Sequence, residues 1–293
     1  MMSDWIFMNG TYVHREDAKV SVFDRGYLFG DGVFEGIRAY NGNVFKLKEH
    51  IGRLFDSAHS LLISIPYTHD EIKNIVIETL KKNHLDTAYI RIIVSRGVGD
   101  RYNLDPFVCM NPQLIVITEK FNAFSSEFYD NGVEVLTVPT RRNRADTLPP
   151  QVKSLNYLNN ILVKIEAKLA GMQDGLILNT EGYVAESTTQ NLFIYKNDKL
   201  ITPPCSQGAL EGITRNTVID LAREYGYNVE EGLITRYDVY TAEEVFMTGT
   251  AAEIISVVKV DGRVIGLGKP GKHATKLFEN FKKYVVIEGE KIE

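Results

Sequence analysis

Two blocks of strand-like and helix-like segments, separated by a break in the hydrophobic pattern, limit the fold of this sequence more than any other feature. The first block opens with predicted strands at Trp5–Met8 and Thr11–His14, joined by Asn9-Gly10, a strong hairpin signal. A third strand is predicted at Val33–Tyr40, and apolar residues recur at helical spacing over Lys48–Leu62. The other predicted elements of this block are a helix at Asp70–Lys82 and β-branched strands at Tyr89–Ser95 and Leu114–Thr118.

The second block follows residues 120–131, where the hydrophobic pattern lapses and an interdomain linker is predicted. The length of 293 residues permits one large domain or two of ordinary size, since single cores stop growing at roughly 250–300 residues. With the linker, we predict a small N-terminal α/β domain at residues 1–119 and a larger C-terminal domain at residues 132–293. The mixture of helices with largely non-repeating strands predicts an α+β (mixed α/β) protein with a cleft between its domains. The second block has predicted strands at Val133–Val138, Gly175–Asn179, Tyr183–Glu186, Asn191–Tyr195 and Glu244–Met247, and predicted helices at Leu155–Ala170 and Thr214–Tyr225.

Composition excludes several classes of protein. A hydrophobic fraction of 44% with 24% charged residues is ordinary for a globular protein, and a net charge of −5 gives no reason to expect nucleic acid or a membrane as partner. Cys109 and Cys205 have no neighbouring His or Cys at metal-ligand spacing, so we expect neither a disulfide framework nor a metal site. The N-terminus lacks the pattern of a signal peptide, and no apolar run approaches the ~20 residues of a membrane helix. A cytoplasmic protein is expected.

A lysine at a predicted strand-to-helix junction is the first candidate for chemistry. It ends the segment Pro149-Pro150-Gln151-Val152-Lys153, whose prolines hold φ near about −65° and disfavour helix in the residues before them. A lysine with a backbone held in this way projects into a cleft, where loss of solvent activates an amine nucleophile. The alternative is a solvated surface lysine, as most lysines are. A helical stripe follows directly at Leu155, Leu158, Leu162, Ile165 and Leu169.

Two further residues suit a pyridoxal cofactor. Tyr157 lies four positions after Lys153, one turn away if the helix has begun, so its phenol is placed to donate to the ring oxygen. Glu186 ends an apolar strand, and a buried carboxylate needs a cation such as a protonated pyridine nitrogen. The alternatives are a core tyrosine with a satisfied hydroxyl and an exposed acid at the end of a strand.

Two segments have the pattern of phosphate sites. Gly208–Arg215 runs from a glycine-containing loop into a helix start, where backbone N–H groups and the hydroxyl of Thr214 bind anions. Thr248–Glu253 follows a strand and offers a similar turn. Either one is also explained by ordinary helix capping. Arg53, on the polar edge of its predicted helix, is a candidate for a bidentate contact to the phosphate, against simple surface solvation. No dinucleotide or P-loop motif is present, which disfavours nucleotide binding.

Taken together, these residues resemble the fold-type IV pyridoxal-phosphate enzymes, most closely the branched-chain amino acid aminotransferases. The resemblance covers nearly the whole chain and implies the two-domain fold of the D-amino-acid aminotransferases, with pyridoxal 5'-phosphate in the interdomain cleft. It is carried by the segments Phe34–Tyr40, Arg53–Ala58, Val152–Asn159, Gly212–Arg215 and Gly249–Ile254, which stand in the family's order.

The resemblance implies a role for each matching residue. Lys153 would be the catalytic residue, carrying the cofactor as a Schiff base and moving the proton of the substrate. Glu186 would face the pyridine nitrogen and Tyr157 the ring hydroxyl. The remaining cofactor residues would be Arg53, Leu210, Gly212, Ile213, Thr214 and Thr250, and the substrate would be bound by Phe34, Gly36, Arg38, Tyr89, Arg91, Gly249, Thr250 and Ala251.

The implied reaction is transamination between branched-chain L-amino acids (Leu, Ile, Val) and 2-oxoglutarate, giving 2-oxo acids and L-glutamate with ping-pong kinetics. A loop at about residues 99–110 would reach the substrate pocket of a second subunit, which makes a homodimer the smallest active form. Small amino acids and oxo acids are the expected partners, with further assembly left open.

Other activities of the same fold remain open, because fold alone does not choose a reaction. D-amino-acid aminotransferases resemble this chain in carrying an arginine at Arg101, but they have a tyrosine where Phe34 stands and a histidine where Asn103 stands. Arg101 also departs from the branched-chain pattern and suggests a wider substrate range, and Phe29 replaces a frequent tyrosine. Amine transaminases, aminodeoxychorismate lyase and a non-catalytic binding protein are the further alternatives, although the last is expected to lose Lys153 or the phosphate segments.

Overall fold

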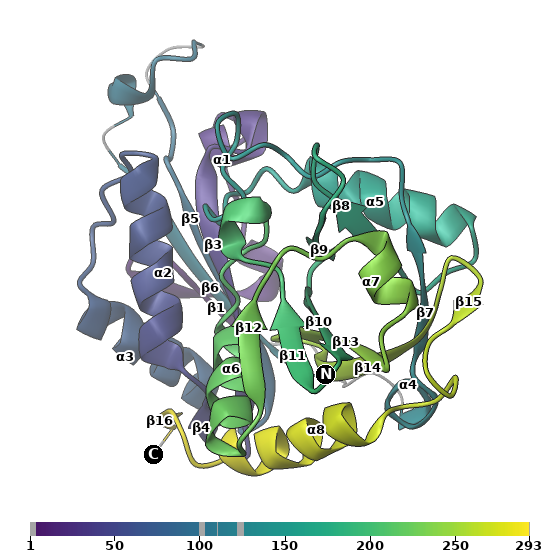
Figure 1. Ribbon diagram of the computed structural model, residues 1–293. Helices are drawn as coiled ribbons and strands as arrows, with labels where there is room; N and C mark the ends of the chain where they lie inside the picture. Colours follow the sequence, from purple (N-terminus) through teal and green to yellow (C-terminus); the bar gives the residue numbers. More distant parts are fainter. Residues whose placement is uncertain (1–3, 100–102, 110, 122–125, 293) are drawn as a thin grey trace. The chain divides into compact units, whose positions relative to one another are not determined.

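A computed structural model of the chain describes residues 4–99, 103–109, 111–121 and 126–292 (Figure 1). The described residues form two compact units, and each is treated separately below. The first unit takes Met1–Asn122, Val152–Asn156 and Tyr284–Glu293, and the second takes Ala123–Gln151 and Tyr157–Lys283. The chain therefore returns twice to the first unit, which the predicted boundaries at residues 119 and 132 do not describe, because hydrophobic patterns report local structure and not long-range pairing.

The first unit is built on a seven-stranded sheet in the order β16-β4-β3-β5-β6-β1-β2. All neighbouring strands in it are antiparallel, and β3 and β5 pair from Gly32 with Ser95 to Ala39 with Ala88. The strands are β1 (Trp5–Met8), β2 (Thr11–His14), β3 (Gly32–Tyr40), β4 (Asn43–Val44), β5 (Ala88–Ser95), β6 (Gln113–Lys120) and β16 (Glu290–Lys291).

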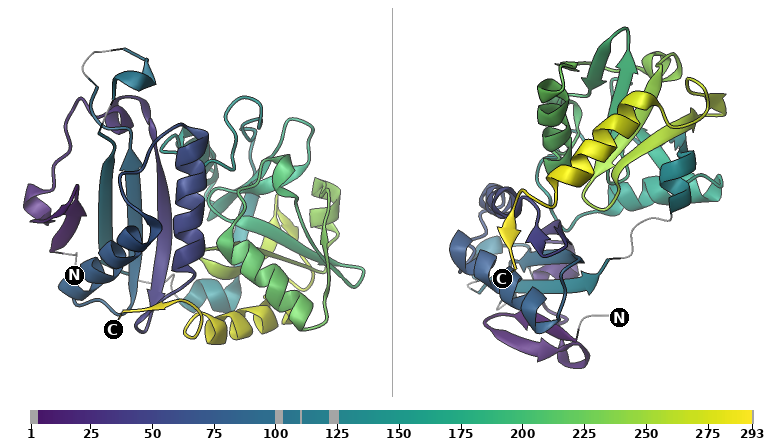
Figure 2. Two further views of the ribbon diagram at one scale, coloured as in Figure 1. Left: turned by 90° about the vertical axis from the view of Figure 1, so that its left-hand side faces the viewer. Right: turned by 90° about the horizontal axis from the view of Figure 1, so that it is seen from below.

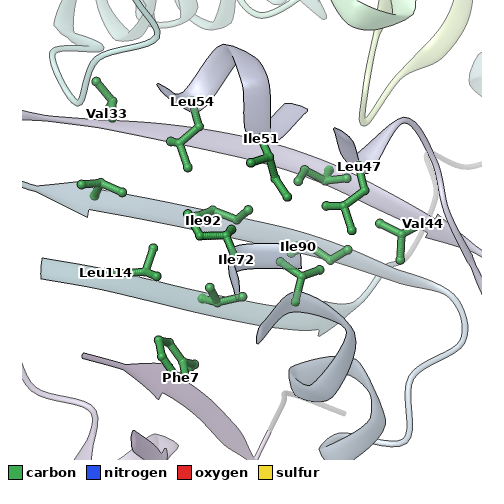
Figure 3. Close-up of a cluster of buried hydrophobic side chains, with 14 of the residues drawn as sticks. Phe7, Val33, Val44, Leu47, Ile51, Leu54, Ile72, Ile90, Ile92 and Leu114 are labelled. Carbon is green, nitrogen blue, oxygen red and sulfur yellow. The ribbon is translucent and has the colours of Figure 1, made fainter. Parts of the chain in front are cut away.

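Two amphipathic helices, α2 (Leu47–Ser60) and α3 (His69–Lys82), pack on this sheet (Figure 2). Helix α3 begins with a capping box between Thr68 and Glu71, which satisfies its first backbone donors. The core lies between the helices and the sheet, with Leu47, Ile51 and Leu54 of α2 directed toward the strands (Figure 3). The short helix α1 (Arg25–Phe29) and the 3-10 turns η1 (Arg15–Asp17) and η2 (Pro106–Val108) complete the unit.

Both returning segments extend the sheet of the first unit. Val152–Asn156 lies along the start of β3, where Ser154 bridges Val33 and the Leu155 N–H donates to Gly32 O at 2.9 Å. At the other end, β16 pairs with β4, and the side-chain amide of Asn43 donates to the carbonyls of Val285 and Glu288. The first unit is therefore completed by residues from the middle and the end of the chain.

The second unit contains a nine-stranded mixed sheet in the order β12-β11-β10-β13-β14-β7-β8-β9, with β15 paired to β14. Its core is formed by side chains such as Leu192, Ile194 and Met247, which are buried on the central strands β10 and β13. The strands are β7 (Val133–Thr137), β8 (Asp174–Leu178), β9 (Val184–Ser187), β10 (Asn191–Lys196), β11 (Lys199–Thr202), β12 (Asn228–Glu231), β13 (Glu244–Gly249), β14 (Glu253–Val260) and β15 (Arg263–Val264).

The helices of the second unit differ from the prediction at one functionally important point. Helix α5 begins at Leu158 and not at Leu155, because the residues before it pair with β3. It packs on β8 through Val163 and Ala167, while Leu158, Leu162, Ile165 and Leu169 of the predicted stripe are exposed and Leu155 is half-buried. The helices and turn of this unit are α4 (Ser126–Asn131), α5 (Leu158–Leu169), η3 (Cys205–Gln207), α6 (Ile213–Glu224), α7 (Arg236–Tyr240) and α8 (Lys272–Tyr284).

The predicted linker contains regular structure. Residues 122–125 lie outside the described part, but Ser126–Asn131 forms helix α4, and the rings of Phe128 and Tyr129 pack against the core of the second unit. Within the described residues, no helix is both long and apolar enough to cross a membrane. The same residues contain no group of three or more His, Cys, Asp or Glu that could hold a metal ion.

Candidate active site

The backbone of Lys153 is fixed within the first unit through both its N–H and its carbonyl. Its N–H donates to Ser57 Oγ of α2 at 3.2 Å, and its carbonyl accepts from the Phe34 N–H at 2.9 Å. The side chain is half-buried, and its amine lies 4.6 Å from the centroid of the Phe34 ring. The segment before this lysine is not extended as predicted, because Pro150 and Gln151 form a turn and Val152 a bend. Lys153 itself is held by β3 and α2.

The residues predicted to bind substrate from β3 and β5 share one face of the sheet. Because side chains alternate along a strand, Phe34, Gly36 and Arg38 face the same side, and Gly36 is opposite Arg91 and Arg38 opposite Tyr89. The Arg91 guanidinium lies 4.3 Å from the Phe34 ring centroid, and a Cβ on Gly36 would overlap the Tyr89 hydroxyl. The structure therefore brings these five residues together on one face of the sheet, and the Lys153 amine lies against one of them, Phe34.

Glu35 points to the opposite face, into the layer between the sheet and α2, and is fully buried. Arg53 donates to both carboxylate oxygens, from Nε to Oε1 at 2.7 Å and from Nη2 to Oε2 at 2.9 Å. His50 Nδ1 lies 2.7 Å from Oε2. Burial acts to raise the pKa of Glu35, but Arg53 and His50 outweigh it and lower that pKa to about 2. Burial lowers the pKa of His50 and so favours its neutral form. Nδ1 is the donor to Glu35, because a carboxylate can only accept.

Arg53 was predicted as a phosphate ligand, and its observed bidentate partner is Glu35. The contact fixes the plane of the guanidinium, so that the orientation of Arg53 is set by the sheet as well as by its own helix. The phosphate role of Arg53 stays a prediction. Glu35 and His50 were not identified from the sequence.

Glu186 is a buried carboxylate on β9 of the second unit. Arg142 Nη2 lies 2.7 Å from Oε1, while the Leu210 N–H donates to Oε2 at 2.9 Å and Asn191 Nδ2 at 3.3 Å. The sequence predicted a buried acid that needs a cation, and the chain itself supplies one in Arg142. Arg142 and Asn191 were both missed, because neither belongs to a motif that marks its partner.

Asn191 joins Glu186 to the start of α6. Its side-chain amide also donates to Leu210 O at 2.8 Å, and its Oδ1 lies so close to Gly212 that a Cβ there would overlap it. Gly212 is the N-cap of α6, and no described side chain caps the helix. The N-terminal donors of α6, beginning at Ile213 and Thr214, are thus presented beside the loop that holds Glu186.

The second predicted phosphate segment forms the turn between β13 and β14. Gly249 pairs with Glu253, and the half-buried Thr250 and Ala251 form the turn between them. Thr248, the residue before it, lies opposite Asn191 in the sheet, so the turn and the start of α6 adjoin the same asparagine. The Thr248 hydroxyl is buried and has no hydrogen-bond partner among the described residues.

Two sequence predictions of this site differ from the structure or fall outside it. A helix starting at Leu155 would place Tyr157 about one turn from Lys153. In the structure Tyr157 is the N-cap of α5, so no helical turn separates the two residues. In the loop at residues 99–110, Arg101 lies outside the described residues, as do positions 100, 102 and 110. Arg25 donates to the carbonyls of Asn103, Leu104 and Asp105 and anchors the part of the loop that is described.

Comparisons with known proteins agree with this arrangement. The model of the family described as amino-transferase class IV matches residues 32–260. A Methanocaldococcus jannaschii relative, assigned provisionally as a branched-chain-amino-acid aminotransferase, is 52% identical over 277 residues, 94% of this chain and 95% of the relative. The branched-chain-amino-acid aminotransferase of Salmonella typhimurium is 38% identical over 286 residues, 95% of this chain and 92% of the relative. The solved branched-chain amino acid aminotransferase of Thermobaculum terrenum, in its PLP-bound holo form, matches with a TM-score of 0.88 at 31% identity, covering 97% of this chain and 94% of that one.

Proposed function

We propose, because this chain belongs to the aminotransferase class IV family, that it transfers the amino group of leucine, isoleucine and valine to 2-oxoglutarate. The membership confirms the predicted mixed α/β fold of type IV, transaminase activity and dependence on pyridoxal 5'-phosphate. Amino acids and oxo acids are accordingly the substrates. The preference for branched apolar side chains is supported above all by the aromatic ring of Phe34 against the Lys153 amine.

The residues of the second unit fit the cofactor. A helix start without a side-chain cap and a buried hydroxyl without a partner among the described residues, that of Thr248, are donors suited to a phosphate. The carboxylate of Glu186, paired with Arg142, suits a cationic ring nitrogen. When bound, pyridoxal phosphate supplies a carbonyl carbon that takes up the amino group and a ring that withdraws electrons from the substrate.

Each residue near these features has a proposed task toward the cofactor. Lys153 holds it covalently, Glu186 faces the ring nitrogen, Tyr157 donates to the ring hydroxyl, and Leu210 packs on the ring. The phosphate is proposed to be bound by Arg53, Gly212, Ile213, Thr214 and Thr250. Family membership supports this assignment, together with the donor groups described above.

The substrate is proposed to be oriented by two further groups of residues. The turn Gly249–Ala251 binds the α-carboxylate with help from Tyr89 and Arg91, since backbone N–H groups and a guanidinium are suited to a carboxylate. Phe34, Gly36 and Arg38 line the side-chain pocket. The Phe34 ring excludes water from the reacting amine, and the Lys153 amine takes the α-proton and returns it. Because the first product leaves before the second substrate binds, ping-pong kinetics are expected.

A panel of amino donors tests the proposed substrate. With 2-oxoglutarate as acceptor, we expect kcat/KM for L-Leu, L-Ile and L-Val to exceed that for D-Ala and for aromatic amines by at least roughly tenfold, because an apolar pocket rewards each buried methylene. L-Glu with a branched 2-oxo acid should run the reaction in reverse. No activity with any branched-chain L-amino acid would refute the proposal, and D-Ala as the best donor would support the D-amino-acid alternative. Release of pyruvate from aminodeoxychorismate would support the lyase alternative.

We also propose that the active form is at least a homodimer that uses the apolar face of α5. Leu158 is 65% exposed and Leu169 is 85% exposed, and the residues between them on this face are also exposed. A contiguous apolar stripe of this kind marks a protein-protein contact. The face consists of Leu158, Ile161, Leu162, Ile165 and Leu169.

Light scattering of purified variants tests the dimer. Leu162→Glu places a charge in the middle of the α5 face and is expected to halve the molar mass in solution, while the wild type gives a multiple of the chain mass of 33.1 kDa. Leu267→Glu, at an exposed loop position outside this face, is the matched control and should leave the mass unchanged. A wild-type mass of one chain would contradict the proposal. The predicted cytoplasmic location stays a prediction.

A further inference from the structure

We propose that Arg142 is a positioning residue for the reaction, which acts by holding Glu186 as a correctly oriented anion. The inference rests on the proposed task of Glu186 at the cofactor nitrogen and adds a residue to it. Arg142 comes from the loop between β7 and α5, outside all the segments that the sequence marked as chemical. Its side chain is only 7% exposed.

The guanidinium of Arg142 is held on three sides. Nη2 lies 2.7 Å from Glu186 Oε1, Nε donates to Gly208 O at 2.9 Å, and Nη1 donates to Asn160 Oδ1 at 3.2 Å. Its backbone N–H donates to Leu178 O at 2.9 Å, which ties the loop to β8. A buried arginine with this many fixed contacts has one orientation, so the position of its charge is set before any ligand binds.

The two oxygens of the Glu186 carboxylate accept from different donors. Oε1 accepts from Arg142, and Oε2 accepts from Leu210 N–H and Asn191 Nδ2. The two sets of donors fix the plane of the carboxylate. Burying an anion without a cation is costly, and the adjacent guanidinium offsets that cost. Without Arg142, a buried Glu186 is expected to take up a proton and lose the negative charge that a protonated ring nitrogen needs.

An arginine with a purely structural role would alter the stability of the protein but not the protonation of the cofactor ring nitrogen. This difference makes the inference testable. We would prepare Arg142→Met, Arg142→Lys, Glu186→Gln and the double variant Arg142→Met/Glu186→Gln. Arg144→Gln is the matched control, since Arg144 lies two residues away in the same loop and forms an exposed pair with Asp146. The readouts are kcat and KM for L-leucine, and the nitrogen-15 resonance of a labelled cofactor in the holoenzyme.

For Arg142→Met we expect kcat to fall about 10- to 100-fold, the range typical of groups that orient a reacting residue, with KM little changed. The nitrogen resonance should move toward its unprotonated position at neutral pH. Arg142→Lys keeps the positive charge but loses the planar set of guanidinium donors. Its nitrogen resonance should therefore lie near that of the wild type, and its kcat between those of the wild type and Arg142→Met. Arg144→Gln should match the wild type in both readouts.

Three results decide the matter. If Arg142 acts through Glu186, adding Arg142→Met to Glu186→Gln changes kcat by less than about twofold. A full multiplicative loss in the double variant, or a wild-type nitrogen resonance in Arg142→Met, overturns the inference and leaves the proposed task of Glu186 intact. A wild-type nitrogen resonance in Glu186→Gln overturns that task and the inference with it. If Arg142→Met does not fold, Arg142→Lys in the two Glu186 backgrounds gives the same test.

Discussion

Replacing Lys153 by alanine is expected to lower transaminase activity by at least roughly 10³-fold, because this one side chain is proposed both to anchor the cofactor and to move the proton. The backbone at this position is held by Ser57 and by the N–H of Phe34, neither of which involves the lysine side chain. The variant should therefore fold as the wild type does. Steady-state kinetics with saturating pyridoxal phosphate measure the loss.

A chemical measurement separates the anchoring task from the activity. Borohydride should fix the cofactor to the wild type on the peptide that contains Lys153, as read by mass spectrometry, and should fix none in Lys153→Ala. Lys168→Ala, at an exposed position in the last turn of α5, is the control and should keep both activity and labelling. Label on another lysine of the wild type, or full activity of Lys153→Ala, would disprove the assignment.

The largest loss of stability is expected from Glu35→Gln. Glu35 is the shared acceptor of Arg53 and His50 in the core of the first unit, and removing the charged partner of a buried pair costs about 3–5 kcal/mol. Urea unfolding of the cofactor-free protein measures the free energy of unfolding. Glu49→Gln, on the same helix as Arg53 and His50 and in a surface pair with Lys46, should cost less than about 1 kcal/mol. Equal losses in the two variants would show that burial of the Glu35 pair contributes nothing.

The same residue gives the wild type a defined acid sensitivity. The pKa of Glu35 is about 2 in the folded protein against an ordinary value of 4.5, so the unfolded chain binds the proton more tightly. The stabilisation by Glu35 is complete above about pH 4.5 and is lost as the pH falls toward about 2, in total ~3 kcal/mol. The lowered pKa of His50 acts in the same direction below its ordinary value of 6.5. In Glu35→Gln, the loss of unfolding free energy between about pH 4.5 and about pH 2 that Glu35 causes should be absent.

Local patterns in the sequence predicted most of the regular elements. The helical periodicity over Lys48–Leu62 and Asp70–Lys82 corresponds to α2 and α3, whose apolar faces are buried in the core. Helix α8 (Lys272–Tyr284) and strand β14 (Glu253–Val260) were missed, although Ala274, Leu277 and Phe281 stand at helical spacing. The start of α5 was placed too early, because the pairing of Ser154 with Val33 competes with the helix and is invisible to periodicity.

The candidate site residues likewise fall into two groups, those that a local pattern marks and those that it does not. Lys153, Glu186 and the two segments proposed to bind phosphate could be singled out because each lies in a short motif. Their supports were not, since Arg142 and Glu35 act through partners that are distant in the sequence and carry no motif. A buried carboxylate at position 186 predicts that a cation exists, but only the fold identifies which one.

The two returns of the chain to the first unit set an order of events during synthesis. Domains usually fold as they emerge, beginning with the N-terminal one. Here the sheet of the first unit takes Val152–Asn156 at β3, and its edge is completed by β16 at Glu290–Lys291. The sheet of the N-terminal unit therefore cannot be completed until Glu290–Lys291 has left the ribosome. The segment that bears Lys153 is added to β3 only after its own translation, so the position of the amine is set later than the strand that holds it is made.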